Sequence, residues 1–350
     1  MVQESDMKNI IDKLEKNNDL TDEEFKALIL TEDEEAIEYL HERARTVRES
    51  VYGKDVYLRG LIEFTNYCKN DCLYCGIRRS NKNADRYRLS KEEILSCAET
   101  GYKLGFRTFV LQGGEDAFFS DEVLEDIIKE LKKRYPECAV TLSVGERERE
   151  SYQRLFDAGA DRYLLRHETA DKAHYESIHP AELSFDHRMK CLRDLKEIGY
   201  QVGCGFMVGS PNQTPDTLLK DIKFIRDFKP EMVGIGPFIP HPDTPLKDAD
   251  KGSFELALKV MALTRLNLPD INIPATTAME TLNPQGRIIA LQSGANVVMP
   301  NVTNTKYRPK YEIYPGKICI SDDATKCRNC IEAKIHSIKR TISKDYGFRK

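Results

Sequence analysis

From residue 58 onward, short apolar runs of four to eight residues alternate with longer amphipathic stretches. Short apolar runs of this kind are typical of parallel strands that are covered on both faces. We therefore predict strands at 58–64, 107–111, 139–143, 162–165, 201–208, 231–236, 271–275 and 295–299.

The amphipathic stretches between these runs predict helices. One stretch follows Ser184, a good N-cap residue, and stops at Gly199, a residue that favours the end of a helix. In another stretch, Pro215 follows Thr214 and takes the first helical position. The predicted helices are 91–105, 121–134, 185–198, 215–228, 254–266 and 285–292.

Eight alternations of strand and helix predict an α/β protein with a complete (β/α)8 barrel of the TIM type. A doubly wound open sheet would give a similar pattern, and both folds bind ligands at the carboxyl ends of the strands. Residues 5–50 are polar with apolar positions at helical spacing, so we expect short helices packed outside the main domain. The predicted organisation is an N-terminal helical segment at 1–54, the barrel at 55–305 and a cysteine-containing extension at 306–350.

The composition is typical of a soluble globular protein, with 40% hydrophobic and 31% charged residues in a chain of 350. No apolar run approaches the roughly 20 residues that span a bilayer, and the first residues do not resemble a signal peptide. We therefore expect a cytoplasmic location, where structural disulfides are rare. The ten cysteines are then metal ligands, reactive thiols or buried side chains. The net charge of −4 gives no reason to expect nucleic acid as a partner.

Three cysteines lie within eight residues, directly after the first predicted strand: Cys68, Cys72 and Cys75. Structural zinc takes four ligands, usually as two close pairs, and none of the seven histidines lies in this loop. An iron–sulfur cluster held by three thiolates accounts for the odd number, because its fourth iron stays open to another ligand. The loop therefore predicts a cluster at the mouth of the barrel.

The spacing C-x3-C-x2-C, with Tyr74 before the last cysteine, resembles the signature of the radical S-adenosylmethionine (SAM) superfamily. The resemblance implies a [4Fe–4S] cluster whose open iron chelates the amino and carboxylate groups of SAM. It also implies reductive cleavage of SAM to a 5′-deoxyadenosyl radical. By the same resemblance Gly113, Gly114 and Glu115, at the end of the second strand, receive the SAM amino group. The alternative is an ordinary Gly-Gly-Glu turn.

Further positions match the superfamily along the chain. Arg166 and Glu168 directly follow an apolar run and should point into the mouth of the barrel. The resemblance implies that Glu168 binds the SAM ribose and that Arg188 pairs with the SAM carboxylate. The alternative for Arg188 is a solvent-facing position on its helix. The strand around Met207 would lie beside the adenine, and Ser143 would complete the cofactor site.

Over essentially its whole length the chain resembles the HydE family of FeFe-hydrogenase maturases, most densely at "YLLRHETA", "MVGIGPFIPHPDTPL", "NIPATTAM" and "YPGKIC". The resemblance implies action on a precursor of the hydrogenase di-iron subcluster, an iron that carries CO, cyanide and cysteine. It also implies a long internal cavity. The residues assigned to this cavity are Gln112 and Arg162 near SAM, Met232, Tyr311 and Tyr314 in its walls, and Thr276 and Thr277 as an anion site towards its bottom.

The cavity segments contain small, apolar and hydroxyl residues where many enzymes have a charged pair. That composition suits a reactive and poorly solvated ligand that must be kept away from water. Thr276 and Thr277 could instead satisfy local backbone groups. Glu280 departs from the family pattern and brings a charge close to the predicted anion site.

The resemblance implies as partners a reductant of the ferredoxin or flavodoxin type, a small organometallic or thiol substrate and other hydrogenase maturases. One alternative is a methylornithine synthase-like mutase, which should gather charged groups inside the barrel, whereas "MVGIGP" at 232–237 offers none. Biotin synthase is disfavoured because Gly203 occupies the position of its cluster cysteine. A non-catalytic metal-binding barrel is a third alternative. An RNA-modifying enzyme would need a basic mouth or an RNA-binding domain, and neither is evident.

A second cysteine group lies near the C-terminus and comprises Cys319, Cys327 and Cys330. It resembles the accessory iron–sulfur site of some HydE proteins, so a second cluster of the [2Fe–2S] or [4Fe–4S] type is expected there. Zinc is the alternative, with an aspartate or His336 as the fourth ligand. The remaining cysteines are expected to be buried core thiols, namely Cys97, Cys138, Cys191 and Cys204.

Overall fold

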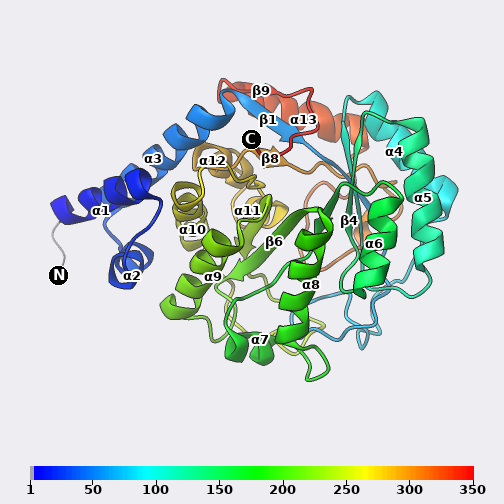
Figure 1. Cartoon of the computed structure of the whole chain (residues 1–350), viewed down its shortest axis with the longest axis horizontal. Helices are drawn as coiled ribbons and strands as arrows, with labels where there is room; N and C mark the ends of the chain where they lie inside the picture. Colours follow the sequence, from blue (N-terminus) through cyan, green and yellow to red (C-terminus); the bar gives the residue numbers. More distant parts are fainter. Residues whose placement is uncertain (1–3) are drawn as a thin grey trace.

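The structure is a computed structural model that describes residues 4–350. Its centre is a parallel sheet of six strands that neighbour one another in chain order (Figure 1). Most residues of these strands are buried, so the α/β fold with a parallel sheet is confirmed. The strands are β2 (Gly60–Thr65), β3 (Thr108–Gly113), β4 (Ala139–Ser143), β5 (Arg162–Leu164), β6 (Gln201–Val208) and β7 (Met232–Pro237).

Helices connect successive strands and bury their apolar faces against the sheet (Figure 1). Each connection contains one main helix, and the connection from β5 to β6 contains the additional short helix α7 (Lys172–Ile178). The main helices are α4 (Lys91–Lys103), α5 (Asp121–Arg134), α6 (Arg149–Asp157), α8 (Phe185–Ile198), α9 (Pro215–Phe228) and, after β7, α10 (Phe254–Asn267).

The predicted ends of α8 and α9 are confirmed. The Ser184 hydroxyl accepts a hydrogen bond from the first turn of α8, and Gly199 ends this helix in the left-handed conformation at φ 111°. Thr214 forms a capping box at the start of α9, with Pro215 in the first turn. Local sequence therefore fixes both helices that flank β6.

The helix α6 was not predicted. It has nine residues, most of them polar or charged, and of these only Ser151, Tyr152 and Leu155 are buried. No side chain caps its start. The Tyr152 ring packs edge-on against Tyr163 of β5 at 5.1 Å, and its hydroxyl accepts a hydrogen bond from Arg147 N. Tertiary packing therefore stabilises a helix that the local pattern does not reveal.

The two last predicted strands are not regular strands. Residues 271–275 form only single bridges, from Asn272 to Met232 and from Pro274 to Val297. Proline has no amide hydrogen to donate to a ladder. This stretch therefore forms isolated bridges and not the regular strand that was predicted.

The last predicted strand, 295–299, is reduced to β8 (Val297–Val298). This strand pairs with β1 (Asp55–Leu58), which also pairs with β9 (Thr341–Ile342), so that the three form a second, parallel sheet. Just beyond β8 the chain reaches β2, where Leu61 N donates to Pro300 O at 2.8 Å. The segment after β7 thus lies between the two edges of the central sheet.

The N-terminal segment forms three helices, α1 (Glu4–Asn17), α2 (Asp22–Leu30) and α3 (Glu34–Tyr52). They lie outside the central sheet, at the left of Figure 1. Their buried side chains, among them Ile11, Phe25 and Leu40, belong to the same hydrophobic core as those of α10. The helices therefore extend the core of the α/β unit.

The C-terminal part contains α11 (Thr277–Leu282), α12 (Gly286–Gln292), the short 3-10 helix η1 (Arg308–Lys310) and α13 (Ala324–Ser337). The last residues lie under the amino ends of the strands, where Tyr346 O accepts hydrogen bonds from Thr108 Oγ1 and Arg162 Nη2. This end of the sheet is therefore covered by protein. Among the described residues, none of the helices is long and apolar enough to cross a membrane.

Candidate active site

A cavity of about 390 Å³ lies at the opposite end of the sheet, where the strands have their carboxyl ends. It is lined by the last residues of β3, β4, β5 and β7, and by a residue near the end of β6. Parallel α/β proteins bind their ligands at this end. These five residues are Gly113, Ser143, Leu164, Pro237 and Met207.

The loop that follows β2 carries three cysteines into this cavity. Hydrogen bonds hold the loop backbone at both ends: Lys69 N donates to Glu115 O, and Gly76 N donates to Ile313 O, each at 2.9 Å. The loop is thus fastened both to the end of β3 and to the C-terminal segment. The cysteines that line the cavity are Cys68, Cys72 and Cys75.

A hydrogen bond to His179 fixes the side chain of Tyr74. Burial lowers the pKa of His179 to about 3, so the ring is neutral. Its Nδ1 donates to Tyr175 O at 2.9 Å, which leaves Nε2 to accept from the Tyr74 hydroxyl at 3.2 Å. The aromatic residue of the cysteine motif therefore has a defined orientation.

The three loop thiols fit a cluster better than a single metal ion. Burial raises the pKa of Cys68 and Cys72, and that of Cys75 to about 12, so the thiolates require a compensating positive charge. The Glu115 amide donates towards the Cys68 sulfur at 3.4 Å, a contact that favours the thiolate. The three sulfurs do not form a compact group of ligand atoms around one point, as a single ion would need. A cluster of several irons holds its ligands farther apart.

Two charged groups of the cavity have unused hydrogen-bonding capacity. Glu115 Oε1 accepts from Glu146 N at 2.8 Å, whereas Oε2 is buried without a hydrogen bond, 3.2 Å from Lys69 Nζ. Arg166 Nε donates to Glu168, but Nη2 is buried without a partner. A buried polar atom that lacks a hydrogen bond is costly. A ligand with an ammonium and a carboxylate group, such as the methionine end of SAM, fits this pair.

Arg188 lies in the cavity wall and is only 6% exposed, so the solvent-facing alternative is excluded. Its Nε forms an ion pair with Glu146, and its Nη1 donates to Arg166 O at 2.6 Å. Glu168 also lines the cavity and has the left-handed φ of 64°, a conformation that is uncommon for glutamate. Strain of this kind is frequent at ligand sites.

Two glycines allow the backbone to approach closely beside the cysteine loop. A Cβ on Gly114 would lie 2.1 Å from Tyr67 O and 2.8 Å from the Cys68 Cβ. Gly145 has φ +75°, and a Cβ there would lie 2.1 Å from the Glu115 Cγ and 2.2 Å from its carboxylate Oε1. The Gly-Gly-Glu segment is therefore packed against the cysteine loop. An ordinary surface turn would not need such close packing.

The cavity lining also includes most of the residues assigned to the substrate. Thr276 has only a long contact, of 3.5 Å, from its hydroxyl to Ile235 O. The Thr277 hydroxyl accepts from Arg287 Nη2 at 3.0 Å. The residues of this group that line the cavity are Gln112, Thr276, Thr277, Tyr311 and Tyr314.

The charge of Glu280 is compensated within the protein. Glu280 is 7% exposed and forms ion pairs with Arg287 Nε, at 3.1 Å, and with Lys334 Nζ. The carboxylate therefore does not add an uncompensated negative charge beside Thr277.

Two predicted residues lie elsewhere. Arg162 and Met232 are the first residues of β5 and β7, and neither is among the residues that line this cavity. Arg162 donates to Thr108 Oγ1 at 3.0 Å and to Tyr346 O at 2.7 Å. The Met232 sulfur accepts from Arg59 at 2.9 Å. The placement of Arg162 beside SAM is therefore corrected: its side chain binds the C-terminal residues under the sheet.

Sequence reasoning missed a buried ion pair in the cavity wall. Glu63 of β2 is 1% exposed and pairs with Lys317 Nζ, which also donates to Tyr311 O at 3.3 Å. The Asn301 side-chain amide donates to the same carboxylate at 2.7 Å. A glutamate inside the apolar run 58–64 was a signal that could have identified this site.

The C-terminal cysteines lie apart from this cavity. Cys319 and Cys327 share a hydrogen bond, which lowers the pKa of Cys319 and raises that of Cys327. Arg308 Nη1 lies 3.9 Å from the Cys327 sulfur. Cys330 is exposed, one turn further along α13. The three do not form a compact single-ion site among the residues that the structure describes.

The sequence profile of the Radical SAM superfamily matches residues 62–225. Among curated proteins, the [FeFe] hydrogenase maturase subunit HydE of Thermotoga maritima is 48% identical over 98% of this chain and 97% of the relative. The 3-methylornithine synthase of Methanosarcina acetivorans is 31% identical over 84% of this chain and 83% of its own length.

Solved structures show the same fold. Methylornithine synthase (PylB) superimposes with a TM-score of 0.85 at 26% identity and covers 95% of this chain, which spans 97% of it. HydG, a maturase of the [FeFe]-hydrogenase, gives 0.82 at 22% identity over 99% of this chain and 76% of its own. From the profile match and the 48% identity along almost the entire sequence, the chain belongs to the radical SAM superfamily and, within it, to the HydE family of [FeFe]-hydrogenase maturases.

Proposed function

We propose that this radical SAM enzyme matures [FeFe]-hydrogenase by acting on a cysteine-ligated Fe–CO–CN precursor of the di-iron subcluster. The observation that carries the proposal is a single cavity in which the cysteine loop, the unsatisfied Glu115 and Arg166 groups and the substrate-end residues meet. The identity of 48% to a HydE maturase supports the choice of substrate.

The loop thiols would hold a [4Fe–4S] cluster. When bound, this cluster would supply the electron that cleaves SAM and yields a 5′-deoxyadenosyl radical. Cys68, Cys72 and Cys75 are the ligands that we assign to it. The protein keeps these sulfurs in a buried loop, and the Glu115 amide donates towards one of them. Tyr74, fixed by His179, would shield the cluster side of the cavity.

The cofactor end would recognise each part of SAM by a different group. Glu115, with Gly113 and Gly114, would accept hydrogen bonds from the ammonium group, and Arg188, supported by Arg166, would pair with the carboxylate. Glu168 would accept from the ribose hydroxyls. Ser143 and Met207 complete this assignment, with Met207 beside the adenine; all of these residues line the cavity.

The substrate end would exclude water and orient the iron complex. Gln112, Tyr311 and Tyr314 would contact it, and the hydroxyls of Thr276 and Thr277 would receive its anionic groups. We propose that Arg162 and Met232 stabilise the end of the sheet that the C-terminal residues cover, because both lie at the amino ends of their strands.

A methylornithine synthase-like mutase is the weaker alternative. An amino-acid substrate would call for charged groups free to bind it, whereas Glu63 and Lys317 neutralise each other in the cavity wall. The identity to methylornithine synthase is 31%, against 48% to HydE. The non-catalytic barrel is disfavoured by the unsatisfied polar groups that face the cavity.

We further propose that the central sheet closes into a (β/α)8 barrel through the segment after β7. The bridges of Asn272 to Met232, Pro274 to Val297 and Leu61 to Asn301 support this closure. In this description residues 1–54 and 306–350 flank a barrel of residues 55–305. The flanking helices share its core, so the three parts would not unfold separately.

Several partners follow from the proposed reaction. A low-potential protein of the ferredoxin or flavodoxin type would supply the electron, and other hydrogenase maturases would deliver the precursor and receive the product. The C-terminal cysteines would bind an accessory [2Fe–2S] or [4Fe–4S] cluster. The lowered pKa of Cys319 supports a thiolate there.

A complementation experiment tests the proposed function. In a host that makes an [FeFe]-hydrogenase, deletion of the gene should abolish hydrogenase activity, and the wild-type gene should restore it. The Cys72→Ala gene should not restore it, whereas the Cys138→Ser gene should, because Cys138 is a buried core thiol away from the cavity. Full hydrogenase activity in the deletion strain would refute the maturase role.

A further inference from the structure

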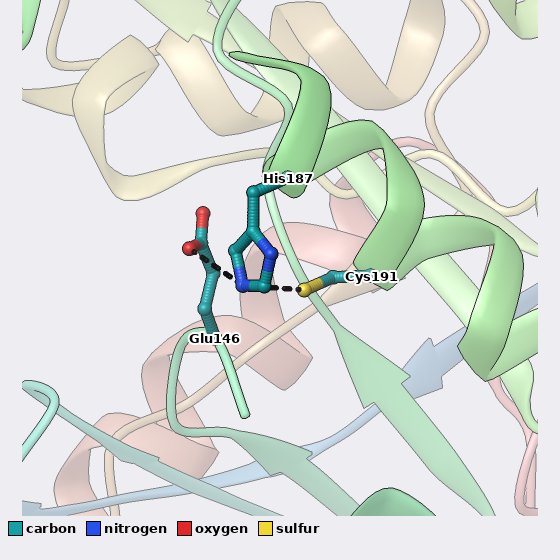
Figure 2. Close-up of side chains that lie close together, drawn as sticks. All are labelled: Glu146, His187 and Cys191. Carbon is teal, nitrogen blue, oxygen red and sulfur yellow. Dashed lines mark hydrogen bonds and ion pairs between the residues drawn. The ribbon is translucent and has the colours of Figure 1, made fainter. Parts of the chain in front are cut away.

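A cluster of three potential metal ligands lies behind the SAM end of the cavity, outside every role assigned above. It comprises Glu146, in the loop between β4 and α6, and His187 and Cys191, one turn apart on α8 (Figure 2). All three side chains point towards one another from two separate elements (Figure 2).

The ligand atoms have the separations that a single small ion requires. His187 Nε2 lies 3.5 Å from Glu146 Oε2 and 3.5 Å from the Cys191 sulfur, and all three atoms lie within 4.8 Å of one another. Zinc bonds of about 2.0–2.3 Å to oxygen, nitrogen and sulfur give tetrahedral edges of about 3.3–3.8 Å. The two short separations already fall in this range.

The arrangement does not resemble a catalytic Cys–His–acid relay. In such a relay the imidazole binds the acid through one ring nitrogen and the thiol through the other. Here the same nitrogen, His187 Nε2, faces both the carboxylate and the sulfur. The Cys191 thiol can also donate to Arg147 O, at 3.8 Å, and a cation between the three ligand atoms would replace these contacts.

The carboxylate is already fixed for this role. Its Oε1 pairs with Arg188, which leaves Oε2 directed at His187, and the side chain of Glu146 is only 8% exposed. Groups that bind the second atom of a ligand in this way orient it and tune the metal site. The His187 side chain is 38% exposed, so one side of the cluster is open to a water ligand and to the entry of an ion.

We propose that Glu146, His187 and Cys191 bind one thiophilic divalent cation of the zinc class. Thiolate, imidazole and carboxylate are ligands of such ions, and three protein ligands leave the fourth position for water. The negative charges of the thiolate and Glu146 offset the cation beside Arg188. The bound ion would fasten α8 to the loop after β4 and thereby hold Arg188 at the cavity. This proposal does not depend on the maturase function.

Cobalt(II) binding to the reconstituted holoenzyme tests the proposal, because a cobalt–thiolate bond has an intense near-ultraviolet charge-transfer band. The iron–sulfur sites are loaded first, so that their cysteines are occupied. Wild type should then bind one more cobalt per chain than Cys191→Ser or His187→Asn, with a band that both variants lack. Cys138→Ser, which removes a buried cysteine outside the cluster, should match wild type.

Equal cobalt content and an equal thiolate band in wild type, Cys191→Ser and His187→Asn would overturn the proposal. His187 is partly exposed, so its variant should fold even if the buried Cys191 variant does not. Circular dichroism of each variant checks this. Because the readout is metal content and absorption, it stays informative whether or not the enzyme matures a hydrogenase.

Discussion

At the scale of single residues, Glu168 combines a strained backbone with a position in the cavity wall. Its φ of 64° costs an L-residue with a side chain about 1–2 kcal/mol, yet its amide hydrogen-bonds to Gly205 O at 2.9 Å and its carboxylate pairs with Arg166. The surrounding structure therefore enforces this conformation. We interpret the strain as the cost of directing the carboxylate towards the SAM ribose.

Two substitutions separate the strain from the chemistry. Glu168→Ala and Glu168→Gly both remove the carboxylate, so each should weaken SAM binding by roughly tenfold or more. Only glycine relieves the backbone, so the glycine variant should be about 1 kcal/mol more stable than the alanine variant. Calorimetric titration with SAM and urea denaturation measure the two effects. Equal stability of the two variants would show that the backbone is not strained.

The site residues were predictable from sequence where a motif carries them. Cys68, Cys72, Cys75 and Glu115 follow strands in recognisable spacing, and the structure brings them to one cavity. The pair of Glu63 and Lys317 was missed because its partners are far apart in sequence and only folding joins them. The position of Arg162 was predicted wrongly. A resemblance identifies the strand that carries a residue, but not the end of the sheet at which its side chain lies.

At the scale of elements, the N-terminal helices pack on the central α/β unit through α3 and α10. His41 of α3 is 8% exposed, and its Nδ1 is buried without a hydrogen bond. Burial, together with the nearby positive charges of Lys259 and Arg45, lowers the pKa of His41 to about 4. The folded protein therefore keeps this ring neutral, whereas the unfolded chain protonates it below about pH 6.5.

This pKa difference predicts a loss of stability in acid. A folded pKa below the unfolded value means that the unfolded state binds more protons between about pH 6.5 and 4, so stability falls as the pH falls through that window. His41 should contribute up to about 1.4 kcal/mol per pH unit there. The drop in melting temperature from pH 7 to pH 5 should be smaller in His41→Leu than in wild type.

The exposed His336 provides the control for this prediction, since a His336→Leu variant should keep the wild-type dependence on pH. An unchanged acid response in His41→Leu would mean that the ring is already protonated in the folded protein or that it has no part in the acid response.

The elements differ in how far local sequence determines them. The capping residues of α8 and α9 can be recognised in the sequence, so the ends of both helices were predicted to the residue. The polar helix α6 and the bridges at 271–275 depend on contacts with distant segments. Periodicity cannot report such contacts, and Pro274 removes a ladder hydrogen bond that an apolar run alone would suggest.

At the scale of the whole molecule, the C-terminal residues cover the end of the sheet opposite the cavity. Gly347 O accepts from Arg59 Nη2 at 3.1 Å, and Tyr346 O accepts from Arg162. These carbonyls accept hydrogen bonds from two buried guanidinium groups, and Arg349 adds an ion pair with Asp270 at 2.7 Å. The amino end of the sheet is thus sealed by the last residues of the chain.

Two glycine substitutions test this seal. Gly53 and Gly347 both have positive φ, 57° and 68°, but a Cβ on Gly53 meets nothing within 4 Å, whereas one on Gly347 lies 2.5 Å from the Tyr57 ring. Gly53→Ala should cost about 1–3 kcal/mol for the backbone alone, because φ 57° with ψ −130° lies outside the left-handed region that other residues adopt. Gly347→Ala should cost about 1–3 kcal/mol more in urea denaturation, because the ring and the tail must separate. Equal costs would mean that the tail is not packed on Tyr57.

The central claim is that the cysteine loop and the residues assigned to SAM, which line one cavity, together cleave SAM. The most direct measurement is the amount of 5′-deoxyadenosine that the anaerobically reconstituted and reduced protein forms from SAM. We predict that wild type forms it and that Cys72→Ala, which keeps all three C-terminal cysteines, forms none. Equal product from both proteins, or none from wild type with its clusters loaded, would contradict this account.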